Sequence, residues 1–118
     1  MGKRDFVDYV VQDLLAELSG VEARAMFGEH CLYLDGALFA LVCDDTLYFK
    51  VGNANRARYL AAGSHQYVYL SRGKKVGMPY WEVPVDVLED REMLAEWARE
   101  SSRIMLPRSP NSKRSRTL

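Results

Sequence analysis

The sequence predicts an α+β fold in which an antiparallel sheet is covered by helices mainly on one face. Three observations predict it: two acidic turn pairs separate short β-type runs, helical periodicity occurs only outside those runs, and the length suits one ordinary domain. The 118 residues are 48% hydrophobic and 27% charged, as is typical of globular proteins. We therefore expect one two-layer domain over residues 4–106, with the element order α-β-β-β-α-β-β-α.

The first half of the chain predicts a helix and then a three-stranded meander. Apolar residues recur at helical spacing over residues 5–18, and Gly20 follows as a helix end. The pairs Asp35-Gly36 and Asp44-Asp45 then separate three runs of strand length. Both central positions of a type I′ hairpin turn need positive φ, which Asp and Gly tolerate well. These pairs therefore predict two tight hairpins in succession.

The second half predicts a helix, a hairpin and a last helix. Residues 53–63 begin with a capping Asn53 and end with Gly63, which favours a short helix. Residues 66–70 and 74–84 are predicted to pair around the turn 71–73. Finally, an apolar stripe at helical spacing before Pro107 predicts the last helix; the stripe consists of Leu94, Trp97, Ala98, Ser101 and Met105.

The register of the meander follows from two-residue loops, because alternate residues of a strand point to opposite sides. One face is predicted to carry His30, Leu32, Leu34, Phe39, Leu41, Cys43 and Tyr48. The other face is predicted to carry Cys31, Tyr33, Leu38, Ala40, Val42, Leu47, Phe49 and Val51. His30 and Cys31 would then point apart, so they cannot form a thiolate–imidazole pair. Cys31 is predicted to be a small core residue, and an internal disulfide would be geometrically awkward.

The predicted sheet has too few polar residues on either face, which predicts an association site. Helices of a two-layer fold cover one side only, and a large exposed apolar patch usually marks a contact surface. We therefore expect a homodimer or a partner-bound form. The candidate interface residues are Leu32, Leu34, Phe39, Leu41 and Tyr48. The alternative is a monomer whose own last helix or the loop near Met78 covers this face.

The last segment, residues 107–118, is predicted to be a disordered basic tail. It carries four of the 16 basic residues of the chain and none of the 16 acidic ones. Its proline, serine and basic content leaves almost nothing to bury. The candidate nucleic-acid contacts are the four cations of this tail, Arg108, Lys113, Arg114 and Arg116.

The sequence offers no catalytic constellation, and we expect no cofactor, no metal and no catalytic residue. His30 and His65 lie in separate segments with no third ligand, and turn chemistry accounts for the clustered aspartates. A thiol enzyme would need an exposed cysteine with a depressed pKa. No apolar run suits a membrane span, and acidic residues interrupt the N-terminal apolar pattern, so we expect a cytoplasmic protein without membrane contact.

Several spaced motifs agree in order with one known family. "MFGEHCLYLDG" at residues 26–36, "LYFK" at 47–50 and "YWEVP" at 80–84 resemble the N-terminal domain of the TfoX/Sxy proteins, which are regulators of bacterial natural transformation. The resemblance covers about residues 5–106 and implies an α+β fold of the secretion-chaperone-like type. Long members carry a C-terminal helical domain and are thought to act with the cyclic-AMP receptor protein. We expect a stand-alone N-terminal domain here.

Three function classes remain open. The favoured class is a non-enzymatic regulatory domain that contacts a protein, such as a transcription factor, as the resemblance implies. The alternative is a nucleic-acid-binding module that uses the basic tail, although the acidic body argues against it. The third class is a small enzyme with Cys31 or Cys43 as its nucleophile.

Overall fold

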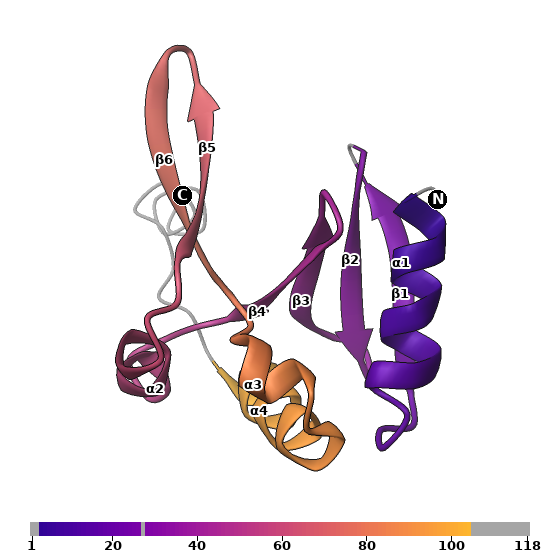
Figure 1. The fold of residues 1–118 in the computed structure, drawn as a ribbon. Helices are drawn as coiled ribbons and strands as arrows, with labels where there is room; N and C mark the ends of the chain where they lie inside the picture. Colours follow the sequence, from indigo (N-terminus) through magenta and orange to yellow (C-terminus); the bar gives the residue numbers. More distant parts are fainter. Residues whose placement is uncertain (1–2, 27, 105–118) are drawn as a thin grey trace, which may run out of the picture.

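A computed structural model describes residues 3–26 and 28–104, and Figure 1 shows its α+β architecture. No helix of the described part is long and apolar enough to cross a membrane. In chain order the elements are α1 (Lys3–Tyr9), the π-helical η1 (Val10–Leu14), β1 (Val21–Met26), β2 (Glu29–Leu34), β3 (Ala37–Cys43), β4 (Thr46–Lys50), α2 (Arg56–Ala61), β5 (Gln66–Ser71), β6 (Lys74–Glu82), α3 (Val85–Leu88) and α4 (Arg91–Arg103).

The sheet has six strands in the order β1-β2-β3-β4-β6-β5, and every neighbouring pair is antiparallel. The predicted fold class is confirmed, and the predicted elements occur in their predicted sequence. Two elements were not predicted: strand β1, which pairs along the whole of β2, and the short helix α3. The sheet therefore has two edges, β1 at one side and β5 at the other.

Tight turns define the meander as predicted. Asp35 and Gly36 have φ of 50° and 87°, and Asp44 and Asp45 have φ of 51° and 58°. Positive φ at both central positions is the requirement of a type I′ turn, whose twist matches that of the strands it joins. The β5–β6 hairpin closes in the same way, with Arg72 at φ 53° followed by a glycine.

The predicted register is wrong in the middle of the meander, because β3 carries a β-bulge. Leu34 pairs with Ala37 as predicted, but Leu32 pairs with Ala40 and leaves Phe39 as the extra residue. A bulge places two residues of one strand opposite one residue of its partner. From Ala40 onward, the faces of β3 are therefore exchanged with respect to the prediction. Ala40 and Val42 share the face of Leu32, whereas Leu41 shares the face of Cys31.

The main core lies between the sheet and the helices. Phe39 and Ala40 are both fully buried in it, together with Leu32, Val42, Leu47 and Phe49 from the sheet. The helices contribute Val10, Leu15, Leu94 and Ala98. The rings of Phe39 and Phe49 pack with centroids 5.7 Å apart in a tilted arrangement. This face carries the helices, as predicted for a two-layer fold.

Helix α2 begins later than predicted. The predicted cap Asn53 lies before helix α2, which begins at Arg56, and Asn55 occupies the N-cap position. The buried Asn55 side chain instead accepts the Gly52 N–H at 2.8 Å and donates to the Lys50 carbonyl at 3.2 Å. Gly63 ends the segment with φ of 73°, as predicted. Met105 and Pro107 lie outside the described residues, as does the whole predicted tail at 107–118.

Candidate interaction groove

The sheet face turned away from the helices, which we call the open face, carries a second apolar cluster. Its buried members are Cys31, Leu41 and Tyr80. Partly buried hydrophobic residues surround them: Tyr33, Leu38, Tyr48, Tyr67 and Met78. Tyr67, Met78 and Tyr80 come from the β5–β6 hairpin, so side chains of this hairpin cover part of the open face.

An apolar groove of about 570 Å³ runs between the hairpin and the open face. Figure 1 shows the hairpin projecting away from the meander. The groove is lined by Met26, Glu29, Cys31, Leu38, Leu41, Tyr67, Tyr69, Met78 and Tyr80. Binding sites are commonly concave, mostly apolar and equipped with a few polar groups, and this groove has that composition.

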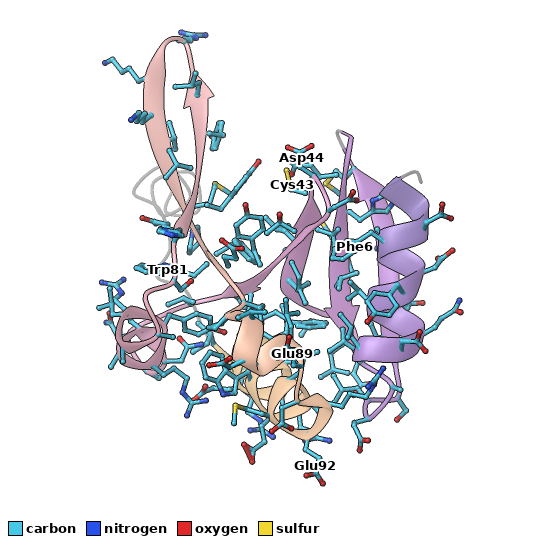
Figure 2. The ribbon with its side chains drawn as sticks, viewed as in Figure 1. Phe6, Cys43, Asp44, Trp81, Glu89 and Glu92 are labelled. Atoms are coloured by element: carbon cyan, nitrogen blue, oxygen red, sulfur yellow. The ribbon has the colours of Figure 1, made fainter. Side chains whose placement is uncertain are left out.

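A polar cluster of Glu29, Cys43 and Tyr67 connects the hairpin to the sheet beside the groove. The Tyr67 hydroxyl donates to Glu29 Oε2 at 2.6 Å, and the Cys43 thiol donates to the same oxygen at 3.2 Å. Cys43 lies at the end of β3 away from helices α3 and α4 (Figure 2). The Tyr67 ring also packs on Tyr48, with centroids 5.0 Å apart. These contacts join β2, β3, β4 and β5 and hold the base of the hairpin.

The pKa values of Tyr67 and of both thiols are raised, which favours their protonated forms. The Glu29 hydrogen bond, followed by burial, raises the pKa of Tyr67 above its ordinary range. Burial raises the pKa of the Cys43 thiol, and burial together with the nearby Glu29 charge raises that of Cys31. A nucleophilic cysteine needs a lowered pKa. Both thiols are shifted in the opposite direction, which argues against the thiol-enzyme reading.

The predicted interface residues do not share one face. Leu32 and Phe39 are fully buried in the main core, and Leu34 packs against it. Leu41 and Tyr48 belong to the cluster on the open face. The bulge at Phe39 causes this division, and for the same reason Cys31 and Cys43 lie on one face rather than on opposite faces. Both cysteines are free thiols. A second apolar face therefore exists, but with different members.

The remaining candidates are the two histidines, the aromatic residues of the hairpin and the cations of the tail. His30 lies in β2 and His65 is exposed before β5, and the described residues contain no group of three or more potential ligands placed to hold a metal. The aromatic residues of the hairpin divide between two clusters: Trp81 packs against the main core, whereas Tyr67 and Tyr80 belong to the open-face cluster. The tail cations Arg108, Lys113, Arg114 and Arg116 lie outside the described residues.

Sequence reasoning missed Glu29 and the role of Tyr67. Their contact joins residues 38 positions apart and depends on how the hairpin lies over the sheet. No local pattern encodes that arrangement. The acidic Glu29 in an otherwise apolar run was the available signal, since a carboxylate beside buried aromatic residues requires hydrogen-bond donors.

Fold and groove together define an α+β domain with an open antiparallel sheet and an apolar groove on the face turned away from the helices. The chain belongs to the TfoX N-terminal domain family, whose model matches residues 13–104. It is similar to Protein Sxy of Escherichia coli (strain K12), with 29% identity over 96 residues that cover 79% of this chain and 44% of that protein. The chain thus spans less than half the length of this curated relative.

Proposed function

We propose that this domain is a non-enzymatic regulatory module that binds a protein partner in the groove and acts on transcription through that partner. The observation that carries the proposal is the apolar groove between the open face and the anchored hairpin. Membership of a competence-regulator family and the raised thiol pKa values support it. The partner is expected to insert an apolar segment, because Met26 and Tyr69 expose apolar surface at the groove.

The test is an affinity capture from the source cell with the full chain as bait, with and without nuclease, read by mass spectrometry. A transcription factor retained after nuclease treatment supports the proposal, and the cyclic-AMP receptor protein is the first to check because of the family resemblance. Capture that requires nucleic acid and disappears when residues 107–118 are removed supports the alternative, a nucleic-acid-binding module that uses the tail.

A matched pair of variants locates the binding surface. Met26 lines the groove and is 43% exposed, whereas Met93 is 39% exposed on α4, outside the groove. Met26→Asp places a charge in the apolar groove and is expected to abolish capture of the partner. Met93→Asp makes the same change at similar exposure and is expected to preserve it. Equal capture by both variants would refute the groove as the binding site.

A further inference from the structure

The two edges of the sheet differ in how they are protected against pairing with another strand. Strand β1 carries Glu22 and Arg24, which form an exposed ion pair at 3.7 Å. Strand β5, with the sequence QYVYLS, contains no charged residue and no proline. Native proteins commonly guard an exposed edge with charges, prolines or short strands. Only β1 has such a guard of charges, so β5 is a ready template for a further strand.

Strand β5 is also exposed on both of its faces. Val68, Tyr69 and Leu70 are all exposed large hydrophobic residues, with Tyr69 on the groove side. On its inner edge β5 pairs with β6, and on its outer edge the described part of the chain provides no neighbouring strand. Figure 1 shows the turn end of the β5–β6 hairpin extending away from helices α2, α3 and α4.

We infer that β5 pairs with β5 of a second copy of this chain, in antiparallel orientation about a two-fold axis, and that the two sheets become continuous. This inference goes beyond the proposed function, because the pairing uses the outer edge of β5; the two surfaces share Tyr69, which also lines the groove. Closed two-fold dimers are the commonest way in which a self-complementary surface is covered. The added strand satisfies the outward-facing backbone groups of β5, as in other strand-addition complexes.

The side chains select one register. Directly opposite residues of an antiparallel pair lie on the same face of the sheet, so in a symmetric pair of β5 strands their positions differ by an even number. One residue must therefore lie opposite its own copy, with the two-fold axis between the two. With the axis at Tyr69, Val68 lies opposite the partner's Leu70, and this apolar pair occurs twice. Tyr69 lies opposite the partner's Tyr69 on the groove side. An aromatic pair and two aliphatic pairs are favourable cross-strand contacts.

Charge complementarity supports a second copy as the occupant. Between Gln66 and Met78 the chain carries three cations and no acid, all at the turn end: Arg72, Lys74 and Lys75. In the antiparallel arrangement each turn end approaches the base of the other hairpin. Glu82 and Asp86 lie at that base, with Ser64 and His65 lining the same hollow. The cationic turn end of each copy therefore lies at the same end of the joined sheet as the acidic hairpin base of the other copy, in both halves of the dimer.

Sedimentation equilibrium on the full chain and on two variants tests this dimer. Wild type is expected to dimerise, and Leu70→Lys is expected to raise the dimer dissociation constant by about tenfold or more, because the change acts twice across the axis and adds like charges. Leu60→Lys is the control: Leu60 is 57% exposed on α2, against 69% for Leu70, and its change should leave the constant unaltered. Thermal melting of each variant confirms that it is folded.

A cysteine at the axis tests the register and does not depend on the charge variants. Directly opposite Cα atoms lie about 4.5–5.5 Å apart, within disulfide range. Tyr69→Cys should therefore give a reducible covalent dimer under mild oxidation, whereas Leu60→Cys should not. A strictly monomeric wild type, a dimer that Leu70→Lys leaves intact, or equal crosslinking by both cysteine variants would overturn the inference. Association that requires added nucleic acid or another protein would also overturn it.

Discussion

The burial of Phe39 makes a quantitative prediction about stability, because its side chain lies in the main core beside the β-bulge of β3. Phe39 is fully buried and packs against Phe49. Phe39→Ala removes a buried aromatic ring, which costs about 3–5 kcal/mol of the free energy of unfolding. In a domain of this size each kcal/mol lowers the melting temperature by about 4 °C, so the expected fall is roughly 12–20 °C.

The neighbouring residue supplies the control for this prediction. Leu38 is half-buried on the open face, so Leu38→Ala should cost only about 1–2 kcal/mol. Both values are measured by urea unfolding monitored by circular dichroism, with the same slope expected for wild type and variants. Equal losses for the two variants, or a loss below about 1 kcal/mol for Phe39→Ala, would show that Phe39 does not lie in the core.

Three further outcomes are expected. Both thiols have raised pKa values in the fold, so they lose their protons more readily in the unfolded chain. Their contribution to the free energy of unfolding is therefore complete below the ordinary thiol pKa and is lost as pH rises through the folded-state pKa. Wild type should consequently lose more stability at alkaline pH than the double variant Cys31→Ala/Cys43→Ala. Asp45→Gly relieves a positive φ of 58° and should raise the free energy of unfolding by up to about 1 kcal/mol in the same urea assay, whereas a decrease would contradict the turn geometry. Deletion of residues 109–118 should leave the melting temperature nearly unchanged, and a fall of many degrees would show that the tail packs on the body.

Turns and alternation were readable from the sequence because they are local. Asp35-Gly36 and Asp44-Asp45 specify their own backbone geometry, so the meander could be predicted without knowledge of the rest of the fold. Strand β1 was missed since its sequence, VEARAM, consists largely of residues with good helix propensity. Its strand conformation follows from pairing with β2, which is a tertiary effect.

The candidate site was less predictable, because it depends on one inserted residue and on one long-range contact. Nothing in the run around Phe39 and Ala40 distinguishes a bulge from a regular strand, yet the bulge decides which side chains share the open face. The groove is lined by both Tyr67 and Glu29, whose hydrogen bond crosses the sheet. An apolar second face could be predicted from composition, but its members could not.

Hydrogen exchange of the full chain, with and without the partner captured from the cell, tests the central claim most directly. The partner is expected to protect backbone amides on both sides of the groove, in residues 29–31 of β2 and at Met78 and Tyr80 of β6, and to leave the exposed side of α4 unchanged. Protection confined to α4 or to residues 107–118, with the groove unchanged, would contradict it.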